Sequence, residues 1–302
     1  MTECERIIKK GVVTEDFLKE ETICDFLVTS DRKKLFAVLL DMLLEFDKVC
    51  KKYGLTYFLD GGSMLGAVRH HGFIPWDDDI DVCMPRRDYD KFVTLKEEFN
   101  NPYFLQTPYT DPEYFYCPAR IRNTNTTAMV ETFAYQKFNH GIWLSIFPLD
   151  NWKPDTEKEV EKINELIKEN STYMRMTNPH LDDRSKERVR NYSGRNPLET
   201  YEEIQKIAQQ FNAQPTGFVS AAVSCVLPYS KKIWKEEDFK SAVYVDFEGH
   251  KIPIPIGYDH ILTTVYGDYM KFPPIEERGL HHSGTIFDAD KPFTYYVSNL
   301  EK

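Results

Sequence analysis

One segment, residues 60–81, constrains this chain more than any other, because it joins a glycine turn to a dense run of acids. It reads Asp-Gly-Gly-Ser-Met-Leu-Gly-Ala-Val-Arg-His-His-Gly-Phe-Ile-Pro-Trp-Asp-Asp-Asp-Ile-Asp. Gly61 and Gly62 let the backbone bend as a short helix opens at Ser63, so that successive N–H groups can face one anion. The first half of the segment therefore predicts a cradle for a phosphate.

The second half of the segment supplies carboxylates. If Asp79–Val82 is a strand, Asp79 and Asp81 point to one face, and Ile80 points to the core. In a regular strand Asp78 would point away from the pair. Four acids within five residues repel one another unless a cation or protonation relieves them; they are Asp77, Asp78, Asp79 and Asp81. Cradle and carboxylates together predict a site for a metal-bound nucleotide.

Composition narrows the alternatives. With 302 residues and 41% apolar content, the chain can bury a sizeable core. Its net charge of −10 argues against a broad nucleic-acid-binding surface, which needs clustered Lys and Arg. The six cysteines are scattered and form no C-x-x-C pair, as expected of reduced thiols. We expect a cytoplasmic protein, because we find no signal-peptide run and no apolar segment of membrane-spanning length. Any membrane contact would be peripheral.

The apolar pattern gives an α/β order of elements. Ser30 could cap a helix over Asp31–Tyr53 that stops at Gly54, and a buried strand over Leu55–Leu59 leads to the glycine turn. Further strands are expected at Tyr103–Leu105, Tyr114–Arg122, Thr127–Val130 and His140–Phe147, and helices at Asp88–Phe99, 155–177, 200–213 and Tyr258–Tyr266. A hairpin is expected to turn at Glu248-Gly249, between Val243–Phe247 and Lys251–Ile256. We divide the chain into an N-terminal arm and packing helix (1–54), a catalytic core (55–150) and a mainly helical region that completes the pocket (151–302).

The segment also resembles the signature of the LicD family, phosphotransferases of the nucleotidyltransferase superfamily that are related to fukutin and the fukutin-related protein. The resemblance continues through several short motifs in the family's order, over roughly residues 30–285. They are Arg86, Asp88-Tyr89, Phe92, Ile146-Phe147-Pro148-Leu149-Asp150, Tyr258-Asp259, Tyr266-Gly267-Asp268-Tyr269-Met270, Pro273-Pro274 and His281-His282.

The resemblance implies a nucleotidyltransferase-type mixed α/β fold and a reaction. The reaction is transfer of a substituted phosphate, such as phosphocholine or a polyol or sugar phosphate, from its CDP-linked donor to a hydroxyl of a glycan. CMP would be released, and the divalent ion would be Mg²⁺ or Mn²⁺. The acceptor would be a surface glycan or glycolipid of a teichoic acid, capsule or lipopolysaccharide.

We assign site residues on this basis. Asp79 and Asp81 are the expected metal ligands, and one of them could also act as the base for the incoming hydroxyl. Asp77 is expected as a further ligand. Gly61, Gly62 and Ser63 are expected to hold the diphosphate. Arg69 could reach a phosphate or point to solvent, and Trp76 could wall the pocket or pack beneath Pro75. His281 and His282 are interpreted as a substrate-contacting or pocket-ordering pair.

One position departs from the family pattern. Family members usually carry Asp where this chain has Ser145, and the fold's third carboxylate is expected there. Three readings remain open: Asp77 or Asp150 substitutes, the metal site is weaker, or the chain binds substrate without turnover. Asp150 could equally cap a turn. A nucleotidyltransferase acting on RNA or an aminoglycoside shares the glycine–carboxylate pair, but would have no use for the later motifs.

Overall fold

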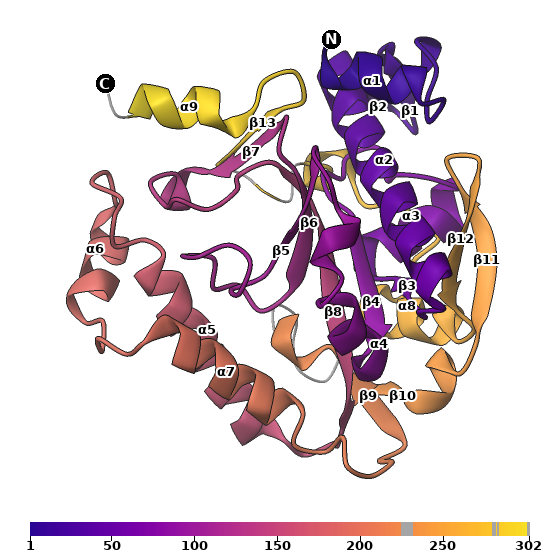
Figure 1. Cartoon of the computed structure of the whole chain (residues 1–302). Coiled ribbons are helices and arrows are strands. Elements are labelled where there is room, and N and C mark those ends of the chain that lie inside the picture. The colour runs from indigo at the N-terminus through magenta and orange to yellow at the C-terminus, as the bar shows by residue number, and fades with distance from the viewer. Residues whose placement is uncertain (225–231, 280–281, 283, 301–302) are drawn as a thin grey trace.

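A long central strand, β8 (Ile142–Trp152), organises the fold (Figure 1). The computed structural model describes residues 1–224, 232–279, 282 and 284–300. Within them, β8 pairs in parallel with β4 (Asp81–Pro85) and antiparallel with β6 (Ala119–Asn123) and β9 (Phe218–Ser220). The sheet continues to β3 (Phe58–Leu59), β5 (Tyr103–Gln106) and β10 (Trp234–Lys235). It is a mixed sheet, as the sequence predicted.

One face of this sheet packs on the N-terminal helices. Alternate strand residues such as Val82, Leu144 and Ile146 are fully buried in a core shared with α2 (Ser30–Tyr53), because successive strand side chains face opposite sides. The N-cap of α2 is Thr29, whose hydroxyl accepts from the Arg32 N–H at 3.3 Å. The predicted cap, Ser30, instead donates to the Leu18 carbonyl. Gly54 ends the helix in a left-handed conformation, as predicted.

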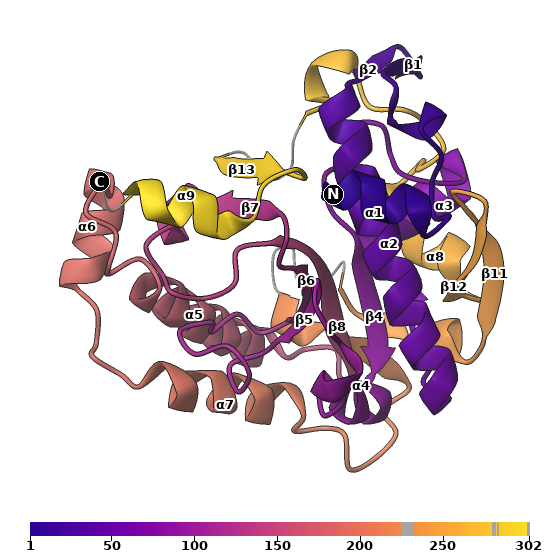
Figure 2. The ribbon, with the colours of Figure 1, turned by 45° about the horizontal axis from the view of Figure 1, so that its top comes forward.

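The opposite face carries a second group of helices, α5 (Glu157–Tyr173), α6 (Asp183–Arg190) and α7 (Pro197–Ala208). Figure 2 shows α5 and α7 on one side of the sheet and α1 (Glu3–Lys9) with α2 on the other. These helices have a core of their own around Trp152, with Ile163, Leu166 and Ile204. Trp152 lies at the end of β8, so the strand does not stop at Pro148 as expected but continues to this core.

The C-terminal part returns to both ends of the sheet. The hairpin β11 (Ala242–Phe247) and β12 (His250–Pro255) turns at Glu248-Gly249, as predicted, and α8 (Tyr258–Tyr266) follows with the predicted bounds. Strand β13 (Thr285–Asp288) then pairs with β7 (Thr127–Val130), and α9 (Phe293–Leu300) ends the described chain. This pairing brings His282, three residues before β13, close to Asp78.

The remaining elements are short. They are β1 (Glu21–Ile23), β2 (Phe26–Val28), α3 (Gly61–His70), α4 (Arg86–Phe92) and 3₁₀ turns at Asp16–Leu18, Lys96–Glu98, Glu131–Phe133, Ala222–Ser224, Glu236–Phe239 and Ile275–Glu277. Helix α4 covers only the start of the predicted Asp88–Phe99 helix, and α6 was not predicted. The main core draws residues from all three expected parts of the chain, and the division at residues 54 and 150 stays a prediction. No helix in the described ranges is long and apolar enough to cross a membrane.

Candidate active site

The glycine turn at the start of α3 lies between the carboxylates of Asp60 and Asp77. Asp60 is the N-cap of α3, and its carboxylate accepts from the Gly61 N–H at 2.9 Å. Gly61 adopts a φ of +50°, which favours glycine. A Cβ at Gly62 would lie 2.8 Å from Oδ2 of Asp77. Glycine at position 62 therefore lets the Asp77 carboxylate approach the first turn of the helix.

The acidic run does not begin as a strand. Strand β4 starts only at Asp81, and the residues before it are irregular. The Asp81 N–H donates to the Ser63 hydroxyl at 2.9 Å, and the Asp81 carbonyl accepts from the Asp60 N–H at 2.9 Å. Ser63 is buried and does not line the cavity, so its predicted contact with a diphosphate is corrected: its hydroxyl holds the backbone of Asp81.

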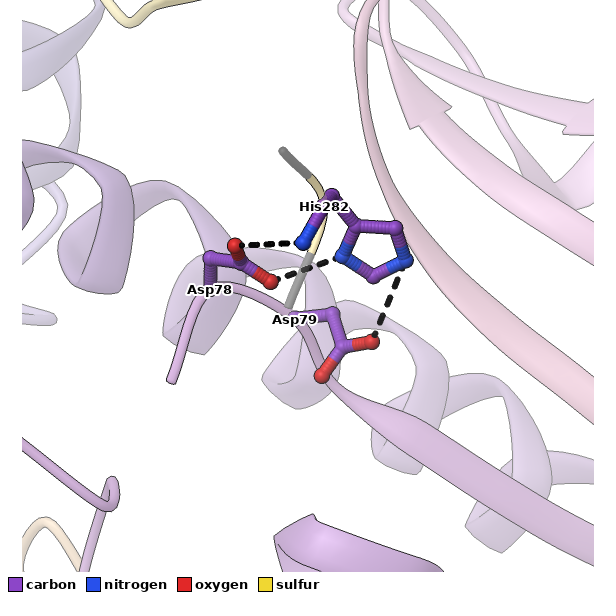
Figure 3. A group of neighbouring side chains, drawn as sticks. All are labelled: Asp78, Asp79 and His282. Atoms are coloured by element: carbon purple, nitrogen blue, oxygen red, sulfur yellow. Dashed lines mark hydrogen bonds and ion pairs between the residues drawn. The ribbon is translucent and has the colours of Figure 1, made fainter. Parts of the chain in front are cut away.

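Asp78 does not point away, because the strand that would have turned it outward is not formed there. Its carboxylate binds His282 twice, through Nδ1 at 2.7 Å and through the backbone N–H at 3.1 Å (Figure 3). Nε2 of His282 lies 3.8 Å from Oδ2 of Asp79. One ligand atom each from Asp78, Asp79 and His282 lie within 4.8 Å of one another, a spacing that could hold a metal ion. The other predicted histidine, His281, lies outside the described residues.

The acids are held in an environment that disfavours their charge. Burial, followed by the charge of Asp78, raises the pKa of Asp77 to about 7. Burial and the charge of Asp77 raise the pKa of Asp79 to about 7. Burial and the charge of Asp79 also raise the pKa of Asp81. Because these groups oppose one another's ionisation, a cation placed among them would relieve a real electrostatic cost.

Ser145 lies where the missing carboxylate was expected. It pairs in register with Asp81 across β4 and β8, and its hydrogen bond to Asp81 favours the ionised carboxylate. On the other side of β8, Arg120 pairs in register with Ser145. Asp81, Ser145 and Arg120 thus form one row across three strands, with their side chains on the same face of the sheet. All three line a cavity of about 1100 Å³.

Two further predicted residues also line this cavity. The Arg69 guanidinium donates to the carbonyls of Tyr269 at 2.8 Å and Lys271 at 3.2 Å, so it fixes the loop after α8 instead of pointing to solvent. Trp76 is buried and packs edge-on against Phe272 while facing the cavity. Both residues therefore shape one wall, and the loop they hold forms part of the rim.

Asp150 is not part of this group. It is fully buried, and Arg86 donates to its two oxygens at 2.7 and 2.6 Å. Asn212 donates to Oδ1 as well, at 2.7 Å. Asp150 does not line the cavity, and its carboxylate is fully used by these donors. The proposal that it substitutes as a metal ligand is thereby corrected.

The sequence analysis missed two residues of the site and misplaced a third. Asp60 could have been found, because an Asp directly before a helical glycine pair is a preferred N-cap. Asp78 was misplaced by the assumption of a regular strand. Arg120 gave no local signal, since only the register of β6 on β8 places it beside Ser145.

Comparisons with known proteins agree with this geometry. The domain family described as "LicD/FKTN/FKRP, nucleotidyltransferase domain" matches residues 54–184, which contain α3, β4 and β8. The fold, the acidic cavity and this match define a protein with a nucleotidyltransferase domain. The lipopolysaccharide cholinephosphotransferase LicD of Haemophilus influenzae is 30% identical over 263 residues, 81% of this chain and 93% of that protein. The chain belongs to the LicD family.

More distant matches are local. The ribitol 5-phosphate transferase FKRP of Homo sapiens is 53% identical over 34 residues, 11% of this chain and 7% of that protein. An uncharacterised protein of Rickettsia typhi is 33% identical over 70 residues, 23% of this chain and 22% of that protein. Each of these matches covers less than a quarter of this chain.

Proposed function

We propose that this chain is a phosphotransferase that moves a substituted phosphate from a CDP-linked donor to a glycan hydroxyl, releasing CMP. The observation that carries the proposal is the convergence of Asp77, Asp79 and Asp81 on one cavity wall beside the start of α3. Family membership supports the reaction class. The names of two relatives support phosphocholine or a polyol phosphate as the group transferred, and the first supports a lipopolysaccharide acceptor.

A divalent metal, Mg²⁺ or Mn²⁺, fits the donor set. Asp79 and Asp81 would hold it, with Asp77 or the nearby Asp78 and His282 completing the ligands, since hard cations prefer carboxylate oxygens. The raised pKa values of Asp77 and Asp79 support the fit, because burial and the neighbouring carboxylates both disfavour the ionised forms that a bound cation would stabilise. When bound, such an ion supplies positive charge against the charge that develops on phosphoryl oxygens.

The protein's own groups would position the reactants. Asp60 and Ser63 hold the α3 start and the backbone of Asp81 in place, which fixes where the carboxylates point. One of Asp79 and Asp81 would accept the proton of the acceptor hydroxyl, a role suited to a carboxylate with a pKa near neutrality. The apolar walls of the cavity, including Trp143 and Phe147, would exclude water from the reacting phosphate.

A second candidate function rests on Ser145. Serine is a neutral and weak ligand, so the chain could bind the CDP compound and the glycan without transferring phosphate. The row of Asp81, Ser145 and Arg120 favours this alternative only if the remaining carboxylates cannot hold the metal. The cytoplasmic location and peripheral membrane contact remain predictions.

The test is CMP release from CDP-choline and CDP-ribitol with Mg²⁺ or Mn²⁺ and a panel of surface glycans. We expect release by the wild-type chain, and a loss of at least about a thousandfold in Asp79→Asn and Asp81→Asn. Asp183→Asn, at the exposed start of α6, is the matched control and should keep full activity. Binding of a CDP compound without CMP release from any donor would establish the second function. Failure to bind any CDP compound with metal would overturn both.

A further inference from the structure

Arg120 lines the same cavity as the metal-binding candidates, and Ser145 separates it from Asp81 in the strand row. Its guanidinium lies over the rings of Trp143, at 4.5 Å from the centroid, and Tyr116, at 4.9 Å. Both rings line the cavity. The charge of Arg120 acts on Asp79 and His282, which places it within electrostatic reach of the acidic group. The side chain is therefore held in position by aromatic faces and directed at the site.

Arg120 differs from the nearby Arg122 and Arg69 in having a buried donor, Nε, without an acceptor in the described part of the chain. Arg122, two residues along the same strand, donates to Oε1 of Gln106 and to the Gly141 carbonyl, both at 2.7 Å. Arg69 is engaged by two carbonyls. Burial of an unsatisfied guanidinium donor is costly, so a ligand acceptor is the expected partner.

We propose that Arg120 binds phosphate oxygens of the CDP-linked donor and is thus a catalytic residue of this site. The inference rests on the proposed function, and it deepens it by naming the residue that recognises the diphosphate. A planar guanidinium fork matches phosphate geometry, and the stacked rings fix the fork before the ligand arrives. In the transfer, the acceptor oxygen forms the new bond to phosphorus and gives its proton to Asp79 or Asp81, the bond from phosphorus to the oxygen of CMP breaks, and Arg120 only donates hydrogen bonds.

The same contacts limit where the rest of the donor can lie. Arg120 lies over the rings of Trp143 and Tyr116, and Arg122 also lies over Trp143 at 4.9 Å from its centroid, so cations of the protein already occupy this aromatic wall. A positively charged substituent such as a quaternary ammonium would have to lie away from this wall. The diphosphate would then lie between Arg120 and the acids, with the substituent directed elsewhere in the cavity.

The experiment measures binding and not turnover. Calorimetry with CDP in the presence of Mn²⁺ compares the wild type with Arg120→Gln and Arg120→Lys, and Mn²⁺ alone is titrated separately. We expect CDP to bind Arg120→Gln about 10- to 100-fold more weakly, and Arg120→Lys to recover part of the loss. Mn²⁺ alone should bind both variants at least as tightly as it binds the wild type. Arg184→Gln, an exposed charge-matched control on α6, should bind CDP as the wild type does.

Each alternative outcome has a distinct meaning. CDP affinity within twofold of the wild type in Arg120→Gln overturns the role of Arg120 and leaves the proposed function intact. Loss of Mn²⁺ binding together with CDP binding in folded Arg120→Gln and Arg120→Lys also overturns it, because Arg120 would then support the structure of the acidic group. If the wild type binds no CDP with metal, the proposed function fails, and the role of Arg120 fails with it.

Discussion

Two groups of buried aspartates in this protein have opposite surroundings. Asp150, on β8, has an arginine and an amide as internal donors, which oppose the effect of burial on its pKa. Asp77 and Asp79 instead have other aspartates as neighbours, whose charge adds to burial and raises the pKa of each further. The difference separates an acid that is paired with an arginine from a group of carboxylates whose charges repel one another, and a bound cation would reduce that repulsion.

The largest effect is expected from breaking the ion pair between Arg86 and Asp150. Arg86→Gln leaves Asp150 buried without a cation and should lower the free energy of unfolding by about 3–5 kcal/mol. Chemical denaturation measures the loss, and exposed Arg184→Gln is the control. The folded variant should still bind Mn²⁺ with unchanged affinity, since Asp150 is outside the cavity. Weaker Mn²⁺ binding would connect the two groups and contradict the contrast drawn between them.

The next largest effect is expected from adding Mn²⁺ to the group of acids around Asp79. Mn²⁺ at a hundredfold excess over its dissociation constant should raise the free energy of unfolding by about 2.7 kcal/mol, by mass action. The gain, measured by thermal unfolding, should disappear in Asp79→Asn and persist in Arg86→Gln. Equal stabilisation of Asp79→Asn would show that the ion binds elsewhere.

The contrast between the two groups also explains what the sequence could predict. The helix predicted over Asp31–Tyr53 and the short helix that opens at the glycine turn rely on local rules, and both are confirmed within a few residues. Asp150 was misassigned because its partners, Arg86 and Asn212, are 64 and 62 residues away along the chain. Local patterns do not reveal which cation a buried acid meets.

The same limit applies to the contacts of Arg120 and Asp78. Arg120 and Ser145 become neighbours only through strand register, and Asp78 meets His282 only because β13 returns to β7. The resemblance predicted that the acids form the site. Only tertiary pairing shows that Asp79 lines the cavity, that Ser63 supports the backbone and that Asp150 belongs to an ion pair. The structure adds these contacts to the sequence prediction.

A smaller effect tests the charge balance of the acidic group without metal. Because the folded pKa of Asp79 is about 7, against 3.8 for an ordinary Asp, the folded state binds more protons than the unfolded state between these values. The contribution of this group to the stability of the metal-free protein should therefore be fully present below about pH 4, fall as the pH rises, and be lost above about pH 7. Asp79→Asn should flatten this fall and stabilise the metal-free protein at pH 8 by on the order of 1–2 kcal/mol.

The measurement is denaturation across pH 5 to 8 in a metal chelator. The matched control is Asp16→Asn, an exposed acid in a 3₁₀ turn, which should leave the slope unchanged. An Asp79→Asn variant that is less stable than the wild type at pH 8 would mean that the carboxylate is already balanced within the protein, as Asp150 is.

The smallest expected effect converts Ser145 into the carboxylate that the family pattern contains. Ser145→Asp should raise Mn²⁺ affinity by up to about tenfold, or about 1.4 kcal/mol, because the new acid lies in the strand row beside Asp81. If the fold tolerates the change, the transfer rate should rise as well.

Arg120 is the neighbour of Ser145 on the other side and would compete with Mn²⁺ for the new carboxylate. The double variant Ser145→Asp with Arg120→Gln should therefore bind Mn²⁺ more tightly than Ser145→Asp alone. No gain in metal affinity or rate in either variant would remove Ser145 from the position of the vacant ligand, and the weakened-site alternative would lose its basis.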